Sequence, residues 1–175
     1  IWVFGYGSLI WKPDFEHTAR LPCVLPGWKR RFWQHSPDHR GTPEEPGRVV
    51  TLLPDSAAET VGVAYRLAAT STQHVLKALD HREKAGYSRE MVQVRALESA
   101  DTVSALVYVA TEFNTDFAGP ASAAEIAKLV QIRVGPSGTN KDYVLRLQRA
   151  LAELGHIDPH VDAIVAHLSV SRGLS

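Results

Sequence analysis

The stretch Thr60-Val61-Gly62-Val63-Ala64-Tyr65-Arg66-Leu67 alternates large apolar side chains with small or polar ones. A period of two places the valines, the tyrosine and the leucine on one face of an extended strand. The preceding segment Arg48–Leu53 has similar strand-forming residues, and the turn signal Pro54-Asp55-Ser56 lies between the two. We therefore expect two consecutive strands that are joined at this turn.

Strand signals continue on both sides of this pair. Ile1–Tyr6 predicts a short buried strand that runs into a glycine turn, and Pro22–Gln34 predicts strand segments broken at Pro26-Gly27. Tyr87–Leu97 and Thr102–Thr111 predict two further strands. Their expected inward-facing residues are Val92, Val94, Val103, Ala105, Val107 and Val109.

Helical spacing is concentrated later in the chain. One helix is expected to begin at Ser71 or Thr72, to bury Val75, Leu76 and Leu79, and to stop at Gly86. Three more are expected over Ala121–Ile132, Asn140–Leu154 and Pro159–Val170, the last with Asp158-Pro159 as its cap and first turn. A run of strands with helices inserted late predicts an α+β fold on an antiparallel or barrel-like sheet. The lack of regular βαβ alternation argues against a doubly wound parallel sheet.

The composition indicates an ordinary globular protein. Its 175 residues are enough for a single domain over 1–175 with a sizeable core. Lys plus Arg and Asp plus Glu both count 19, so no net charge recruits nucleic acid or acidic membranes. We expect the basic cluster Lys29-Arg30-Arg31 to be a solvated strand face.

The single cysteine, Cys23, excludes an intrachain disulfide and favours a cytoplasmic location. It has no recognisable activating partner, so an inert thiol is expected. No apolar run approaches the roughly 20 residues of a membrane helix. We expect a monomer whose partner is a small molecule, with neither nucleic acid nor membrane involved.

The segment Phe4-Gly5-Tyr6-Gly7-Ser8-Leu9 is the first candidate for chemistry. Its glycines let the backbone turn sharply after a strand and bring N–H groups close to a ligand. Such a turn suits a carboxylate or the oxyanion of an attacked carbonyl. The segment matches neither the dinucleotide fingerprint, nor a Walker loop, nor a nucleophile elbow. A plain strand-ending turn is the alternative interpretation.

The segment Asp80-His81-Arg82-Glu83-Lys84 is the second candidate and stands at the expected end of a helix. Its spacing alone is typical of a solvated helix end. A carboxylate there faces the negative end of the helix dipole, and an inward-facing Glu83 would also be desolvated. Both effects would raise its pKa, which is how a carboxylate becomes a general base.

The third candidate is Gly135-Pro136-Ser137-Gly138-Thr139-Asn140, which leads into a helix carrying Tyr143. Thr139 or Asn140 is expected to cap this helix, with Tyr143 in its first turn. The alternatives are a plain loop with a cap, or a loop that presents the Tyr143 hydroxyl to a substrate at a pocket mouth.

Two histidine pairs, His35/His39 and His156/His160, have the four-residue spacing of metal ligands on a helix. A proline interrupts each pair, and no third ligand lies at a convincing spacing. We therefore expect no metal, and no part of the sequence calls for another cofactor.

Taken together, these segments resemble the ChaC family of glutathione-specific γ-glutamylcyclotransferases. The matching stretches run in order through nearly the whole chain and are Val3–Pro13, Arg31–Gln34, Asp38–Gly41, Pro46–Leu52, Gly62–Tyr65, Leu79-Asp80, Arg82–Lys84, Gly86-Tyr87 and Gly135–Asn140, with Tyr143. The C-terminal helices match less well.

The resemblance implies a small β-barrel with surrounding helices, the γ-glutamylcyclotransferase-like fold. It also implies a cofactor-free lyase that converts glutathione to 5-oxoproline and Cys-Gly. Glu83 would be the catalytic base, and the loop Tyr6-Gly7-Ser8-Leu9, with Phe4 and Gly5 before it, would bind the γ-glutamyl group.

Two rival functions stay open at this point. A cyclotransferase for other γ-glutamyl compounds would use the same loop and base. A non-catalytic interaction module, such as a regulator of a cation transporter, would need neither. Arg40, Arg48 and Tyr143 are candidates for holding the Cys-Gly half.

Overall fold

The structure is a computed structural model that describes residues 1–82 and 87–173. Backbone contacts divide the chain into two compact units. The barrel unit comprises Ile1–Arg30 and Leu52–Thr115, and the helical unit comprises Arg31–Thr51 and Asp116–Ser175. The expected single domain over 1–175 stays a prediction.

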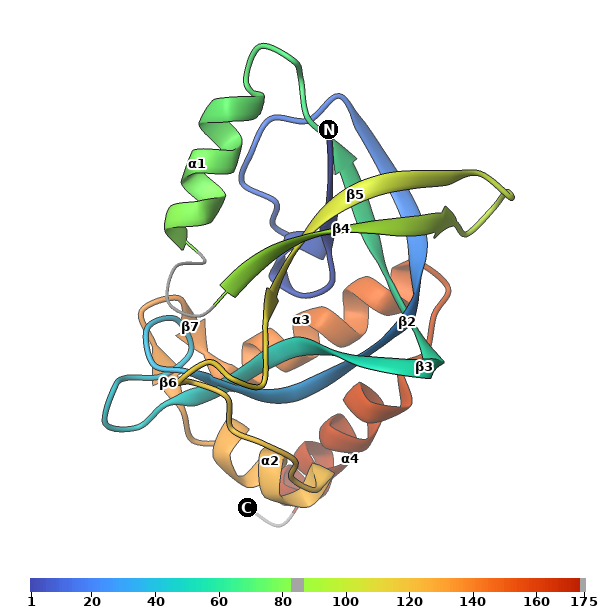
Figure 1. The fold of residues 1–175 in the computed structure, drawn as a ribbon. Helices are drawn as coiled ribbons and strands as arrows, with labels where there is room; N and C mark the ends of the chain where they lie inside the picture. The colour runs from blue at the N-terminus through green and yellow to red at the C-terminus, as the bar shows by residue number, and fades with distance from the viewer. Residues whose placement is uncertain (83–86, 174–175) are drawn as a thin grey trace. The chain divides into compact units, whose positions relative to one another are not determined.

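Five strands close into a barrel in the order β1-β3-β2-β4-β5 (Figure 1). Their bounds are Trp2–Gly5 for β1, Ala19–Ser36 for β2, Gly47–Arg66 for β3, Tyr87–Ala96 for β4 and Thr102–Ala110 for β5. β1 pairs antiparallel with β3 and parallel with β5, and the antiparallel β4 and β5 lie side by side. Closure removes the unpaired edges of the sheet. The predicted α+β class and small barrel are confirmed.

The barrel is filled by side chains from all five strands. Val94, Ala105, Val107 and Val109 are buried in its core, and Val92 and Val103 pack against that core, as predicted. The other buried members are Phe4, Cys23, Leu25, Leu52 and Ala64. The alternating positions on β4 and β5 therefore identified the inner face of the barrel correctly.

Strand β3 is buried on both of its faces between Thr60 and Tyr65. Ala64 belongs to the barrel core, and the ring of Phe4 from β1 passes close to Gly62. A Cβ added to Gly62 would lie 2.8 Å from Phe4 Cζ and 2.2 Å from the carbonyl oxygen of Gly5. Only glycine fits this position, because β1 and its aromatic side chain approach the β3 backbone so closely.

The predicted breaks at Pro26-Gly27 and Pro54-Asp55-Ser56 are wrong, because β2 and β3 continue through them. Gly27 has a φ of +86°, a conformation that glycine adopts readily, so β2 bends there without ending. Pro54 is exposed, and Asp55 Oδ1 accepts the N–H of Ala57 at 3.0 Å. A proline is tolerated where the strand needs no backbone donor.

Helix α1, Thr72–Arg82, follows β3 in the barrel unit. Its start is as predicted, since the Val75 N–H donates to the Ser71 carbonyl at 2.9 Å. Val75 and Leu79 are buried in a cluster that Leu76 joins from its partly buried position. The predicted stop at Gly86 lies outside the described residues.

The helical unit contains α2 (Ala123–Val130), α3 (Asn140–Glu153) and α4 (Pro159–Gly173). α4 packs against α2 and α3. These three helices confirm the expected ones, each within a few residues at its ends. Among the described residues, none of the helices combines the length and hydropathy of a transmembrane span.

The caps of the later helices follow side-chain chemistry. Thr139, not Asn140, caps α3, because its side chain accepts the N–H of Asp142. Asp158 Oδ1 accepts the N–H of His160 at 3.0 Å, as the predicted Asp-Pro pair requires. Ser122 begins α2 with a capping box, which the sequence analysis did not identify.

Asn140 has a different task from the predicted cap. It is fully buried, its Oδ1 accepts the N–H of Arg48 at 2.7 Å, and its Nδ2 donates to the Arg48 carbonyl at 2.8 Å. The side-chain amide thereby replaces a neighbouring strand for one residue of β3. This attaches the first residue of α3 to β3 within the helical unit.

A small hairpin of β6 (Val134–Gly135) and β7 (Gly138–Thr139) precedes α3 and was not predicted. Ser137 N–H donates to the His39 carbonyl at 2.9 Å. A Cβ on Gly135 would lie 2.3 Å from that same carbonyl oxygen, so the glycine permits close approach of the two backbones. The Gly-Pro-Ser-Gly segment therefore packs its backbone against the Asp38–Gly41 loop.

Cys23 lies in the barrel core and is fully buried. Desolvation raises the pKa of its thiol from 9.0 to about 12, and a backbone hydrogen bond with Ala64 only partly opposes this shift. Since the thiolate is the nucleophile, we expect iodoacetamide to leave Cys23 unmodified at about pH 8 in the native protein and to alkylate it in urea. Intact-protein mass spectrometry measures this, and fast stoichiometric modification of the native protein would contradict it.

Candidate active site

The glycine-rich loop leaves β1 at Gly5 and enters a single turn of 3-10 helix, η1 (Ser8–Ile10). Ile10 N–H donates to the Gly7 carbonyl at 2.9 Å, which closes this turn. A Cβ on Gly5 would lie 2.6 Å from the Leu9 Cβ. The tight turn that was predicted after the first strand is therefore present, and Gly5 allows the chain to fold back on itself.

Three side chains hold the carbonyls and the aromatic ring of this loop. Arg30 Nη1 donates to the Tyr6 carbonyl at 3.0 Å and to the Val61 carbonyl at 2.8 Å. Tyr6 Oη donates to the Tyr108 carbonyl at 2.6 Å. Tyr65, whose pKa is raised mainly by burial, stays a neutral donor and lies 2.7 Å from the Leu9 carbonyl.

Three backbone N–H groups of the loop, in contrast to its carbonyls, lack hydrogen-bond partners among the described residues. Within residues 1–82 and 87–173, the N–H groups of Gly7, Ser8 and Leu9 have no hydrogen-bond acceptor. The carbonyls of Tyr6 and Leu9 are occupied, as described above, so they do not compete for a ligand. Successive unpaired N–H groups in a turn make a concavity that suits an anion. Binding of an anion by these N–H groups stays a prediction.

The end of α1 contacts the same loop. Arg82 Nη2 donates to Ser8 Oγ at 3.0 Å in a partly buried position. Asp80 Oδ1 accepts the Tyr108 hydroxyl at 2.7 Å and pairs with Arg89 at 3.2 Å. Two guanidinium groups, those of Arg30 and Arg82, thus contact the loop, and their positive charge favours a negatively charged ligand.

Glu83, the predicted catalytic base, lies outside the described residues. The residue before it in the chain is Arg82, whose contact with Ser8 is given above. The role of Glu83 stays a prediction.

Among the other predicted residues, Phe4 has its side chain in the barrel core and is 1% exposed. It offers a ligand only its backbone. Tyr143 belongs to the helical unit, where it is 6% exposed and packs edge-on against Phe32 at a ring distance of 5.9 Å. The Arg40 guanidinium lies 5.4 Å from the centre of the Tyr143 ring, and its Nη1 donates to the Thr139 carbonyl at 3.0 Å. Substrate binding by Tyr143 stays a prediction.

Sequence reasoning missed Arg30, Tyr108 and Arg82. The expectation that Lys29-Arg30-Arg31 is a solvated face is wrong for Arg30, which is 2% exposed. On a strand the middle residue of three points away from its neighbours, so Arg30 shares its face with Phe32 rather than with the other two cations. The alternation of side chains along the strand was the signal that could have identified Arg30 as buried. Nothing in the sequence indicates the contacts of Tyr108 or Arg82.

The members of each predicted histidine pair have separate surroundings. His39 Nδ1 lies 3.3 Å from Ser137 Oγ, while burial, assisted by the charge of Arg48, lowers the pKa of His35. His160 Nε2 accepts the N–H of Phe32 at 2.9 Å, which requires an unprotonated nitrogen. In the described part of the chain, no three His, Cys, Asp or Glu side chains gather as a metal site.

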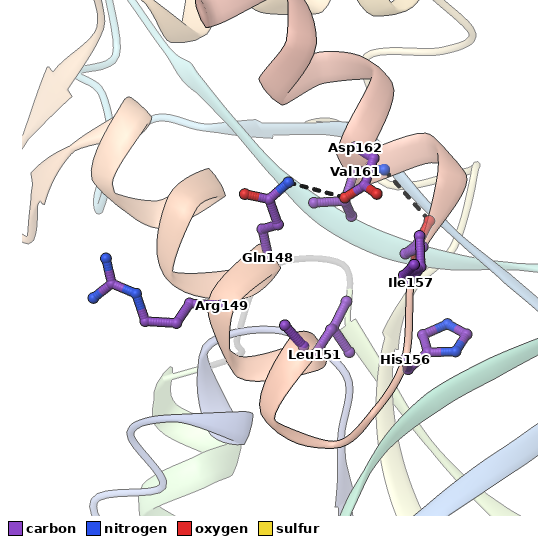
Figure 2. Close-up of a pocket in the computed structure, with 9 residues that line it drawn as sticks. Gln148, Arg149, Leu151, His156, Ile157, Val161 and Asp162 are labelled. Carbon is purple, nitrogen blue, oxygen red and sulfur yellow. Dashed lines mark hydrogen bonds between the residues drawn. The ribbon is translucent and has the colours of Figure 1, made fainter.

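His156 lies instead in a pocket at the turn between α3 and α4 (Figure 2). Gln148 Nε2 donates to Asp162 Oδ1 at 2.9 Å across one side of this pocket. The other lining residues are Arg149, Leu151, Ala152, Ile157, Asp158 and Val161. None of the residues predicted to bind substrate lines it.

Known proteins match the chain over nearly all of its length. The family model for ChaC-like protein covers residues 1–171. Glutathione-specific gamma-glutamylcyclotransferase 1 of Danio rerio is 41% identical over 96% of this chain and 88% of its own. The enzyme of that specificity from Saccharomyces cerevisiae is 35% identical over 88% of this chain and 86% of its own.

Solved structures agree with the sequence comparisons. A crystal structure of the gamma-glutamyl cyclotransferase specific to glutathione from yeast has a TM-score of 0.90, with 32% identity over 97% of this chain and 96% of that chain. The resemblance inferred from the motifs is confirmed. This chain belongs to the ChaC family.

Proposed function

We propose that this protein degrades glutathione by cyclising its γ-glutamyl group, giving 5-oxoproline and Cys-Gly. The observation that carries the proposal is the loop Tyr6–Leu9, with anchored carbonyls and available N–H donors beside two guanidinium groups. Membership of the ChaC family and the names of the relatives are the reason for proposing glutathione as the substrate.

The substrate carries its own nucleophile. The α-amine of the γ-glutamyl residue attacks the γ-carbonyl carbon, a C–N bond forms in a five-membered lactam, and the C–N bond to Cys-Gly breaks. One proton leaves the amine and one reaches the departing nitrogen, so no redox change occurs. Because the reaction is intramolecular, an enzyme gains most by holding the substrate in the reactive rotamer.

The loop would supply that orientation. The N–H groups of Gly7, Ser8 and Leu9 would bind the negatively charged end of the γ-glutamyl group. Any of them that faces the γ-carbonyl would also stabilise the oxyanion of the tetrahedral intermediate. Phe4 and Gly5 would contribute by shaping the backbone that leads into the loop.

Glu83 would be the general base and general acid of the reaction. An α-amino group has a pKa near 8, so at neutral pH most of it is ammonium, which cannot attack. Glu83 would accept the first ammonium proton and deliver it to the leaving Cys-Gly nitrogen. It would then accept the second proton, which the attacking nitrogen loses as the lactam forms, and return it to the released amine, so that Glu83 ends in its starting state. The contact between Arg82 and Ser8 supports this role, because it ties the residue adjacent to Glu83 in the chain to the loop.

The Cys-Gly half offers a terminal carboxylate, for which an arginine is the natural partner. From the sequence, Arg48 is one candidate for that partner. Arg40 and the Tyr143 hydroxyl are the other candidates. We further propose that the protein is a cytoplasmic monomer with this small molecule as its partner.

The direct test is to mix the purified protein with glutathione and to quantify 5-oxoproline and Cys-Gly by mass spectrometry. We expect both products in equal amounts, and much slower turnover of γ-glutamyl-alanine. Faster turnover of γ-glutamyl-alanine would assign the protein to other γ-glutamyl substrates. No product from either would contradict the enzymatic proposal and favour an interaction module.

A further inference from the structure

We propose that Arg82 is a positioning residue that makes the Ser8 hydroxyl a hydrogen-bond donor toward the α-carboxylate of the bound γ-glutamyl group. The inference rests on the proposed function and adds a residue to its machinery. Its basis is the contact between the end of α1 and the glycine-rich loop, 74 positions apart in the chain.

The polarity of this contact follows from the chemistry of arginine. A guanidinium carries only hydrogen-bond donors, so in the 3.0 Å contact Arg82 Nη2 donates and Ser8 Oγ accepts. The hydroxyl proton of Ser8 must then point away from Arg82. A serine without such a partner could turn its proton or its lone pairs toward a ligand, whereas this serine offers its proton.

The arginine is held in place from its own side. The Tyr108 hydroxyl donates to Asp80 Oδ1 at 2.7 Å, and Arg89 pairs with the same carboxylate oxygen at 3.2 Å. Leu79, one turn before Arg82, is 4% exposed in the cluster beneath α1. The last described turn of α1 thus contacts β4 and β5 through Asp80 and Leu79.

The serine is held from the loop side. Arg30 occupies the carbonyl of Tyr6, and the Tyr65 hydroxyl occupies that of Leu9. The Ser8 O–H joins the N–H groups of Gly7, Ser8 and Leu9 as a set of donors that no described acceptor uses. With no carbonyl of Tyr6 or Leu9 free to compete, this set suits a full, permanent negative charge.

The α-carboxylate is the permanent anion of the γ-glutamyl half, and its charge does not change as the lactam forms. An interaction with it therefore stabilises the bound substrate and the transition state equally. Losing such an interaction raises KM and leaves kcat nearly unchanged. This pattern separates the positioning role from a role in the chemical step.

The test compares glutathione turnover by the wild type, Arg82→Ala, Ser8→Ala and the double variant. We expect KM to rise about tenfold in each single variant, as for a lost hydrogen bond to a charged group, with kcat within about threefold. The double variant should resemble Ser8→Ala, because Arg82 acts only through the Ser8 hydroxyl, which that variant already lacks. Arg82→Lys, which keeps the charge and a donor, should recover part of the loss.

Arg95→Ala is the matched control. Arg95 Nη2 also donates to a side-chain oxygen at 3.0 Å, that of Glu59, but in an exposed ion pair that includes no residue of the loop. Its KM should equal that of the wild type. A KM for Arg82→Ala within twofold of the wild type, or multiplicative effects in the double variant, would overturn the proposal.

A binding measurement separates this inference from the proposed function. Calorimetry of glutathione with the wild type and with Arg82→Ala reports affinity even if no product forms. Lack of product with a tenfold loss of affinity in Arg82→Ala would overturn the enzymatic function and keep the Arg82–Ser8 pair. Normal turnover by the wild type with unchanged affinity in Arg82→Ala would keep the enzymatic function and overturn the role of the Arg82–Ser8 pair.

Discussion

Replacing Glu83 with glutamine is expected to lower kcat for 5-oxoproline formation from glutathione by about a thousandfold, within the range of general-base catalysis. Glutamine keeps the size of the side chain but cannot take a proton from the substrate ammonium. Since binding of the γ-glutamyl group is assigned to the loop, KM should change little. Initial rates of product formation over a range of glutathione concentrations, followed by mass spectrometry, measure both constants.

Glu59→Gln is a suitable control for this variant, because Glu59 is an exposed carboxylate paired with Arg95. It should keep wild-type kcat. Circular dichroism and thermal unfolding must show that Glu83→Gln is folded. If the folded variant turns over within tenfold of the wild type, Glu83 is not the base.

Replacing Asn140 with alanine is expected to lower the free energy of unfolding by about 3 kcal/mol. The change removes both hydrogen bonds to Arg48 and leaves a buried backbone N–H and a buried carbonyl without partners. For a chain of this size, such a loss lowers Tm by roughly 6 to 12 °C. Thermal and urea unfolding followed by circular dichroism measure the effect.

The neighbouring cap provides the comparison. Thr139→Ala removes an exposed N-cap bond to Asp142, which costs about 1 kcal/mol. Asn140→Asp keeps the shape but presents a second oxygen to the Arg48 carbonyl, so it should be at least as damaging as alanine. Equal stability of Asn140→Ala and Thr139→Ala would show that the side-chain amide does not stabilise β3.

Much of the fold could be predicted from residues close together in the chain. The alternation in β4 and β5 identified their inner faces, and cap residues located the starts of α1 and α4, because strand and helix periods are local properties. The continuity of β2 and β3 could not be predicted in this way. Pro54 ends a strand only where its missing N–H is needed, which depends on the neighbouring chain.

The candidate site likewise has features that neighbouring residues predict and features that only distant residues create. The glycine spacing of the loop, the cluster that contains Glu83 and the likeness to the ChaC family are all readable from consecutive residues. The burial of Arg30, the two hydrogen bonds of Asn140 and the contact of Arg82 with Ser8 join residues far apart in the sequence.

The amino-acid sequence by itself therefore determined the class of fold and the family, and it predicted which segments carry chemistry. Tertiary structure alone decided which side chains hold the loop and that Arg82 donates to Ser8. The physical reason is that turn geometry and periodicity depend on neighbours in the chain. A hydrogen bond across 74 positions exists only once the barrel has closed and α1 has packed against it.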